Sequence, residues 1–148
     1  MSRNYYCEIH LHLAWHTKLS APLLTPDVES VVYRHVRQLL VAERGVYLQE
    51  IGGIETHVHL AVTIQPHVPI SDLVGRLKGS SAYAANQELA KGQKILEWQT
   101  GYGVLSFGTK DLEWVTAYIR NQRTHHQQGT VHERLERTTA REDADTTE

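Results

Sequence analysis

The sequence is poor in several residue types, and each shortage narrows what the protein can be. Its 148 residues include a single cysteine, Cys7, so no disulfide can form within the chain. No apolar run is long enough to span a membrane, and the N-terminal stretch MSRNYYCEIH lacks the apolar middle of a signal peptide. We therefore expect a cytoplasmic protein without membrane contact, whose length fits one domain with a substantial core.

The sequence also lacks the excess of basic residues that is typical of nucleic-acid-binding proteins. Its formal net charge is −2 at pH 7, so a DNA-binding surface would have to be a local patch. Acidic residues concentrate at the C-terminal end, where residues 138–148, TTAREDADTTE, contain no large apolar side chain. We predict that residues 1–132 form the domain and that residues 133–148 form a disordered acidic tail.

Two stretches alternate between apolar and polar residues, as β-strands with one buried face do. In residues 5–16, the apolar face is Cys7, Ile9, Leu11, Leu13 and Trp15. In the stretch that begins with ETHVHLAV, the apolar face is Val58, Leu60, Val62 and Ile64. The opposite faces of these two predicted strands carry histidines, in the pairs His10–His12 and His57–His59.

The remaining elements follow from turn and capping residues. Thr25 and Pro26 predict the start of a helix that ends before Gly45, and residues 46–51 form a second strand that a Gly52-Gly53 turn would connect to the third. Ser71 or Asp72 is a candidate cap of a second helix, which would reach about residue 89. A strand at 104–107 and a helix starting at Thr109 or Asp111 complete the order.

The order βαββαβα predicts an α+β fold with a ferredoxin-like βαββαβ unit and an added C-terminal helix. Its sheet would be mainly antiparallel, with helices on one face. The other face, which carries His57 and His59, would be left for a ligand.

Two adjacent imidazoles suit a divalent metal ion, although a lone His-x-His pair is more often a pair of surface residues. By spacing alone, His10 and His12 are as good a pair as His57 and His59. The predicted last helix, WVTAYIRNQRTHH, places Tyr118 four residues before a glutamine, so that both lie on one helical face. Gln122 could offer a carbonyl oxygen as a third ligand, and a phenol beside a metal is a candidate nucleophile.

Five blocks of the sequence together resemble one family, the HUH single-tyrosine transposases of the smallest bacterial insertion sequences, which include the REP-associated tyrosine transposases. The blocks are HLAWHTK, THVHLAV, ISDLVGRLKGSSA, WQTGYGVLSFG and VTAYIRNQRTHH, and they cover most of residues 5–126 in order. A His-x-His motif alone is weak, whereas the five blocks in order are specific.

The resemblance implies an enzyme that cleaves and rejoins single-stranded DNA at hairpin-bearing element ends through a 5′-phosphotyrosine intermediate. It implies Tyr118 as the nucleophile and His57, His59 and Gln122 as ligands of a divalent metal, Mg²⁺ or Mn²⁺. Members of the family are homodimers, so the implied partners are hairpin DNA and a second copy of the chain.

Several other residues have two interpretations each. Arg76 and Lys78 in the second helix are candidate phosphate contacts, and a solvated helix face explains them equally well. Arg120 and Arg123, beside the tyrosine, are better placed to neutralise a phosphate, although Arg120 could equally pair with a carboxylate. His10 and His12 would lie on the sheet face near bound DNA, or simply at the surface. His126, four residues after Gln122, is a minor metal candidate.

Two other functions fit parts of the sequence. A relative that binds DNA hairpins without cleaving them would fit the near-neutral charge and the short C-terminus. A replication initiator or relaxase shares the histidine motif, but the chain is small for that class and the other four blocks do not support it.

Overall fold

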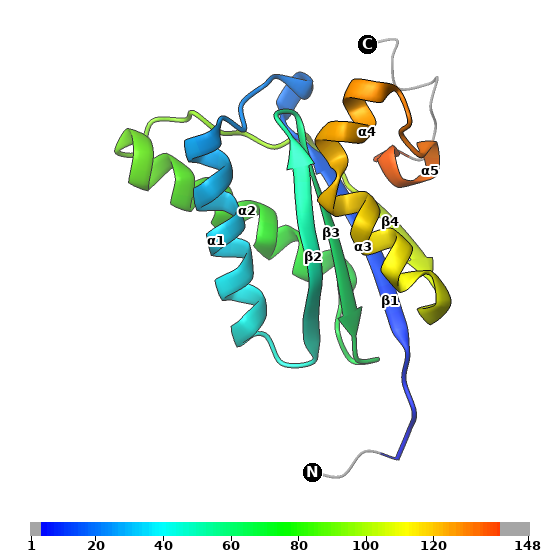
Figure 1. Cartoon of the computed structure of the whole chain (residues 1–148). Helices are drawn as coiled ribbons and strands as arrows, with labels where there is room; N and C mark the ends of the chain where they lie inside the picture. Colours follow the sequence, from blue (N-terminus) through cyan, green and yellow to red (C-terminus); the bar gives the residue numbers. More distant parts are fainter. Residues whose placement is uncertain (1–3, 140–148) are drawn as a thin grey trace.

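The computed structural model describes residues 4–139. Figure 1 shows the elements in chain order. The strands are β1 (Ile9–His16), β2 (Val46–Ile54), β3 (His57–Ile64) and β4 (Gly103–Phe107). The helices are α1 (Pro26–Ala42), α2 (Ile70–Ala90), α3 (Leu112–Arg120), α4 (Gln122–Gln128) and α5 (Glu133–Glu136), with short 3₁₀ turns at Lys18–Ser20 and Thr109–Asp111.

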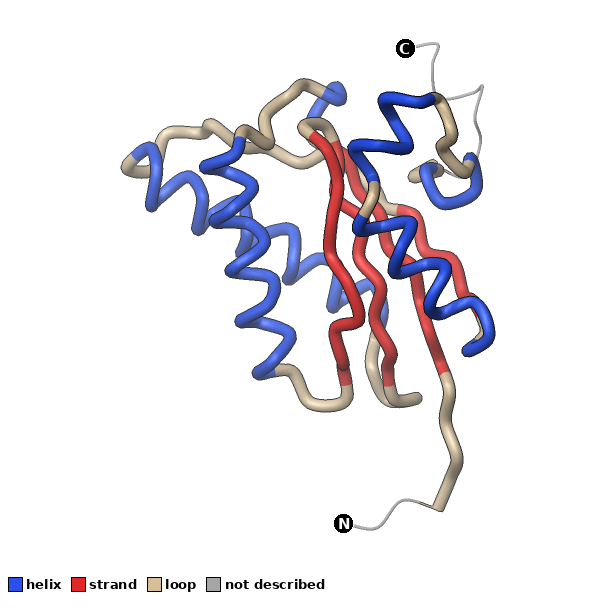
Figure 2. Tube along the Cα trace, viewed as in Figure 1, coloured by secondary structure: helices blue, strands red, loops and turns tan. Residues whose placement is uncertain are grey.

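The four strands form one antiparallel sheet in the order β2-β3-β1-β4. This is the ferredoxin-like arrangement that the element order predicts, and the predicted fold class is confirmed. Helices α1 and α2 cover one face of the sheet, and α3 lies across the other, with α4 and α5 beyond its end (Figure 2). The face predicted to be open is therefore largely covered by the C-terminal helices.

The main core lies between the sheet and the α1–α2 layer. The apolar faces of β1 and β3 supply many of its side chains, among them Leu13, Trp15, Val58 and Leu60, all fully buried. Helix α1 begins as predicted, because the side chain of Thr25 accepts a hydrogen bond from the backbone of Val28. Across residues 4–139, the helices are all too short or too polar to cross a membrane.

Gly52 and Gly53 do not form the predicted turn. Both lie inside β2, paired with His59 and Val58, and the chain turns at residues 55–56 instead. A Cβ atom at Gly52 would lie 2.3 Å from the backbone oxygen of Ile119 in α3. The glycine is therefore needed so that α3 can approach the sheet closely.

The predicted last helix is interrupted at Asn121, whose backbone leaves the helical region between α3 and α4. The cap of α2 also differs from the prediction, because Pro69 precedes its first turn rather than Ser71 or Asp72. The chain from 133 onward was predicted to be disordered, but residues 133–136 form α5 and Leu135 is 3% exposed. Residues 140–148 of the predicted tail lie outside the described residues.

Candidate metal and nucleophile site

The site begins with the register between β1 and β3. His59 lies opposite Ala14, and His12 lies opposite Ala61. Because each imidazole faces a small side chain, the two histidine rings meet diagonally across the strands, with ring centroids 4.9 Å apart. His57 lies directly opposite His16, and their rings stack at 4.7 Å. The sheet thus gathers imidazoles into a layer beneath the C-terminal helices.

Four side chains form a compact group that could hold a metal ion, and their ligand atoms all lie within 4.8 Å of one another. These side chains are His57, His59, His126 and Glu136. One carboxylate oxygen of Glu136 lies 3.1 Å from Nε2 of His57 and 3.3 Å from Nε2 of His59. It also lies 3.4 Å from Nε2 of His126. Three imidazoles from β3 and α4 therefore converge on one oxygen from α5.

Gln122 lies at the edge of this group. Its side-chain oxygen is 3.3 Å from Nε2 of His57 and 3.1 Å from Nε2 of His126. It is 1% exposed, at the first position of α4. The structure therefore brings together His57, His59 and Gln122, the three residues predicted as ligands, together with the minor candidate His126.

Tyr118 also reaches this group, but it is covered. Its side chain is 3% exposed and lies between the rings of Trp114 and His125, with centroids 5.6 Å and 4.7 Å away. The phenol donates a hydrogen bond to the second carboxylate oxygen of Glu136. It accepts one from the backbone N–H of His132 at 2.8 Å. The hydroxyl is therefore held by the segment that ends in α5, whereas a nucleophile must be free to reach its substrate.

Burial and neighbouring groups keep four imidazoles of this layer neutral, those of His12, His16, His59 and His126. Burial, reinforced by neighbouring histidines, lowers the pKa of His12 to about 3 and that of His16 to about 4. Burial also lowers the pKa values of His59 and His126. Neutral imidazoles have a free lone pair, which is the form that binds metal ions.

The acidic groups of the site respond to the same surroundings. Burial alone would raise the pKa of Glu136, but hydrogen bonds to His57 and His59 outweigh it and hold that pKa well below the usual range. Burial and the hydrogen bond to Glu136 raise the pKa of Tyr118 to about 12. The phenol is therefore neutral and the carboxylate ionised at neutral pH.

The four basic residues predicted to contact DNA are paired with other groups. Arg76 bonds the carboxylates of Glu43 and Asp72. Lys78 donates to the backbone oxygens at positions 99 and 101, 2.7 Å and 2.8 Å away, and so fixes the loop before β4. Both residues belong to α2, on the face of the sheet opposite the histidine layer.

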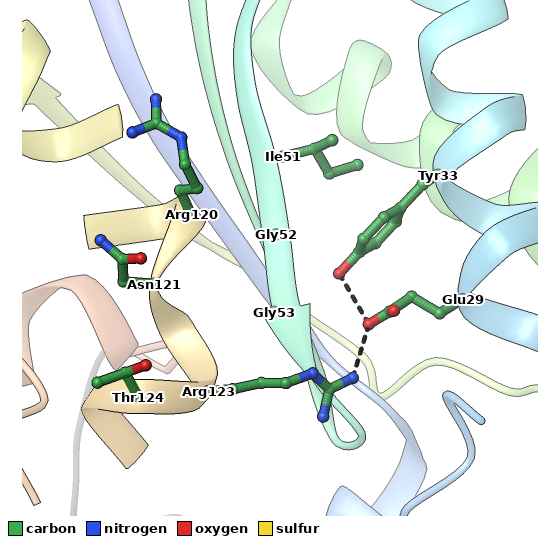
Figure 3. A pocket seen from close by; sticks show the side chains of 9 residues that line it. All are labelled: Glu29, Tyr33, Ile51, Gly52, Gly53, Arg120, Asn121, Arg123 and Thr124. Carbon is green, nitrogen blue, oxygen red and sulfur yellow. Dashed lines mark hydrogen bonds and ion pairs between the residues drawn. The ribbon is translucent and has the colours of Figure 1, made fainter. Parts of the chain in front are cut away.

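Arg120 and Arg123 lie nearer the histidine layer, around a hollow of about 260 Å³. Figure 3 shows this hollow, with Arg123 directed to the carboxylate of Glu29. Arg123 also lies 3.5 Å from Glu55, and Arg120 pairs with Glu50 at 3.1 Å. Carboxylate pairing, the predicted alternative for Arg120, is thus what this structure shows, and Arg76 and Arg123 are paired with carboxylates as well.

His10 and His12 are not at the surface, although His12 lines a hollow of about 360 Å³. They are 6% and 2% exposed. His10 bonds the hydroxyls of Thr63 and Thr109, whereas Nε2 of His12 lies 2.8 Å from Nδ1 of His59. Only His12 touches the ligand group.

Sequence reasoning missed Glu136. The residue lies in a stretch whose composition suggested a solvated tail, and its partner His57 is 79 positions earlier in the chain. The one local signal was Leu135, an isolated apolar residue in a polar stretch. It packs with 3% of its surface exposed and places Glu136 over the histidines.

A four-stranded antiparallel sheet with a His-x-His pair beside a tyrosine helix is the arrangement that the five sequence blocks indicated, that of the single-tyrosine HUH transposases. Residues 5–122 match the sequence profile of the IS200-like transposases, and the chain belongs to this family. The match covers all four strands and the helices up to the start of α4.

Individual relatives agree with this assignment. The ISDra2 transposase TnpA of Deinococcus radiodurans is 26% identical over 126 residues, which cover 81% of this chain and 88% of that protein. A crystal structure of a candidate transposase from the same organism superimposes with a TM-score of 0.64 at 25% identity, covering 82% of this chain and 96% of that one. A REP-associated tyrosine transposase, solved bound to a REP hairpin, shares the fold, with a TM-score of 0.56 at 18% identity and coverage of 88% and 74%.

Proposed function

We propose that this IS200-like transposase cleaves and rejoins single-stranded DNA at hairpin-bearing ends through a 5′-phosphotyrosine on Tyr118, with a divalent metal ion at the histidine cluster. The observation that carries the proposal is the position of the Glu136 carboxylate. One oxygen lies among three imidazoles and the other accepts from the Tyr118 hydroxyl. A single small anion thus bridges the candidate metal ligands and the candidate nucleophile, as a phosphodiester would have to do.

The residues present fit a divalent ion. His57 and His59 would hold it through Nε2, with the oxygen of Gln122 beside them and His126 within reach. Imidazole nitrogens together with amide or carboxylate oxygens suit Mn²⁺, whereas Mg²⁺ prefers oxygen ligands. When bound, such an ion would withdraw charge from a non-bridging phosphate oxygen.

The chain's own residues would then carry out the transfer. The oxygen of Tyr118 attacks phosphorus, the bond from phosphorus to the 3′-oxygen breaks, the phenol loses its proton and the 3′-oxygen gains one. The 5′-phosphate stays on the tyrosine, so a second 3′-hydroxyl can attack it and rejoin the strand. The number of phosphoester bonds is conserved, so no nucleotide cofactor is needed.

This chemistry requires the C-terminal segment, residues 130–137, to move. In the structure, the Tyr118 hydroxyl is engaged by Glu136 and by the backbone of His132. A DNA phosphate and the Glu136 carboxylate cannot occupy the same place, and two anions there would repel each other. We infer that the described conformation is a closed one and that DNA binds after this segment is displaced.

Hairpin DNA and a second copy of the chain are the partners that the family resemblance supports, in the bacterial cytoplasm. A distant relative was solved with a REP hairpin, which agrees with a hairpin substrate. Because Arg76, Lys78, Arg120 and Arg123 are paired internally, recognition through them would depend on rearranged ion pairs and on the shape of the folded DNA. Size-exclusion chromatography with light scattering, with and without hairpin DNA, tests the homodimer.

The direct experiment is adduct formation. The protein is incubated with a labelled single strand that carries a hairpin and with Mn²⁺, and the products are separated on a denaturing gel. We expect a covalent protein–DNA band that requires metal, is absent in Tyr118→Phe and persists in Tyr102→Phe, a tyrosine outside the site. A band of equal intensity in Tyr118→Phe would remove Tyr118 as the nucleophile.

A second function is a hairpin-binding protein that does not cleave DNA. The burial of Tyr118, with 3% of its surface exposed, favours this alternative. It predicts hairpin binding by both the wild type and Tyr118→Phe, with no adduct even when residues 130–148 are removed. An adduct from the truncated protein excludes it.

A further inference from the structure

His12 is a buried histidine for which the proposed reaction has no direct use. It is 2% exposed on β1, the central strand next to β3. Its Nε2 atom lies 2.8 Å from Nδ1 of His59, the ring nitrogen opposite the one that faces Glu136. His12 therefore contacts the candidate ligand from behind, on the side away from the ligand group.

Histidines that bind metal ions usually hold the second ring nitrogen in a hydrogen bond, which fixes the orientation of the ring and the position of its proton. Both candidate ligands on β3 have such a partner. Nδ1 of His57 lies 3.0 Å from the hydroxyl of Thr56, and Nδ1 of His59 faces His12. A ligand histidine with metal on Nε2 must carry its proton on Nδ1, so its partner must accept a hydrogen bond.

His12 supplies an imidazole as the hydrogen-bond partner of His59, and an imidazole can either donate or accept. When Nε2 of His59 faces the Glu136 carboxylate, the proton of His59 belongs on Nε2, so Nδ1 must accept. A neutral imidazole can donate to it in that state and accept from it once a metal replaces the carboxylate. A carboxylate partner could only accept.

We propose that His12 is a positioning residue, which holds the His59 ring with Nε2 toward the metal and exchanges donor and acceptor roles as the site opens. The packing that creates the contact is specific. Ala14 and Ala61, opposite His59 and His12, leave the space in which the two rings meet. The proposal rests on the metal site of the proposed function, and it concerns a residue outside the ligand group.

The structure offers a matched control in His10. It lies on the same face of β1, is 6% exposed and makes two side-chain hydrogen bonds, to Thr63 and Thr109, but it does not touch the ligand group. Replacing His10 by phenylalanine removes a comparable buried imidazole. A general loss of packing would therefore affect His10→Phe and His12→Phe alike.

The test is Mn²⁺ affinity, measured by calorimetry on the full chain. We expect His12→Phe to weaken binding about 10- to 100-fold, the usual effect of losing such a partner. His10→Phe should leave the affinity unchanged. His12→Gln, whose amide can donate or accept, should recover most of it. Should His12→Phe not fold, His12→Leu takes its place. Equal Mn²⁺ affinity in wild type and the folded apolar variant would overturn the proposal.

A second readout separates this inference from the proposed function. Nitrogen-15 chemical shifts of the His59 ring in the metal-free protein report which nitrogen carries the proton. We expect one tautomer in the wild type and in His10→Phe, and a mixture in His12→Phe. Absence of Mn²⁺ binding by the wild type would refute the metal site alone, whereas an unchanged single tautomer in His12→Phe would refute the role of His12.

Discussion

Replacing Glu136 by alanine should activate the protein. The substitution removes the carboxylate that accepts from the Tyr118 hydroxyl and lies among the imidazoles of His57, His59 and His126. A hydrogen bond to a charged group contributes about 1.5–3 kcal/mol. Since each 1.4 kcal/mol is about a tenfold change in an equilibrium constant, the open fraction should rise roughly 10- to 150-fold. Leu135 is 3% exposed and is unchanged by the substitution, so we expect the segment to loosen without losing its apolar contact.

The assay is the initial rate of adduct formation with a hairpin oligonucleotide at a concentration well below saturation. While the open state is the minor one, that rate and the apparent DNA affinity both scale with the open fraction. Glu133→Ala is the matched control, because Glu133 lies on the same short helix with its side chain 80% exposed and pairs with Arg137 at 3.6 Å. It should leave the rate unchanged.

The same measurement can refute the idea that Glu136 competes with DNA for the site. If Glu136 were a ligand that the metal requires, Glu136→Ala would weaken Mn²⁺ binding and lower the adduct rate. Removal of residues 130–148 would then do the same. Slower adduct formation in both variants would show that the segment completes the site instead of competing with DNA for it.

Two further predictions concern the sheet and the phenol. Gly52→Ala would place a Cβ atom 2.3 Å from the backbone oxygen of Ile119 and should lower the free energy of unfolding by about 1–3 kcal/mol in urea titrations. The control is Gly75→Ala, exposed on α2 with nothing within 4 Å, which should raise that free energy by about 0.5–1 kcal/mol. If both variants were destabilised, the close approach of α3 to Gly52 would not be the cause. Burial first, and the hydrogen bond to Glu136 second, raise the pKa of Tyr118 to about 12, so the stability linked to its neutral form is fully present below pH 10 and is lost as pH rises through 12. Ultraviolet difference titration of each protein against its Tyr118→Phe counterpart should show this pKa fall toward 10 in Glu136→Ala, and an unchanged pKa would separate the phenol from the carboxylate.

The sheet could be predicted because its pattern is local and repeated. Alternation in β1 and β3 assigns each side chain to a face, and the element order then leaves few topologies. The Gly52-Gly53 turn failed for a physical reason. Glycine lacks a Cβ atom wherever it lies, and at Gly52 this leaves room for the backbone of Ile119, 67 positions later in the chain. No local rule distinguishes a glycine that turns the chain from one that admits a helix.

The candidate site likewise contains residues that local patterns predict and one residue that they do not. His57 and His59 share a face because a strand has a period of two, and Tyr118 and Gln122 stay close although the helix breaks between them at Asn121. Glu136 could not be found by periodicity, because α5 has only four residues and no helical pattern can be read from so few. Its role depends on Leu135 finding a place in the fold, which composition cannot reveal.

Whether the burial of Tyr118 opposes catalysis depends on which groups cover its ring and hydroxyl. A structural tyrosine packs its ring in the core and satisfies its hydroxyl with a partner that stays fixed when ligands bind. The ring of Tyr118 instead lies against Trp114 and His125 of the C-terminal helices. His132 and Glu136, which bond its hydroxyl, belong to the segment that follows α4. Opening that one segment would remove both bonds while the sheet and the α1–α2 core stay intact. Burial of this kind is compatible with the proposed nucleophile, because the group that covers it is an anion at the position where the proposed reaction needs a phosphate.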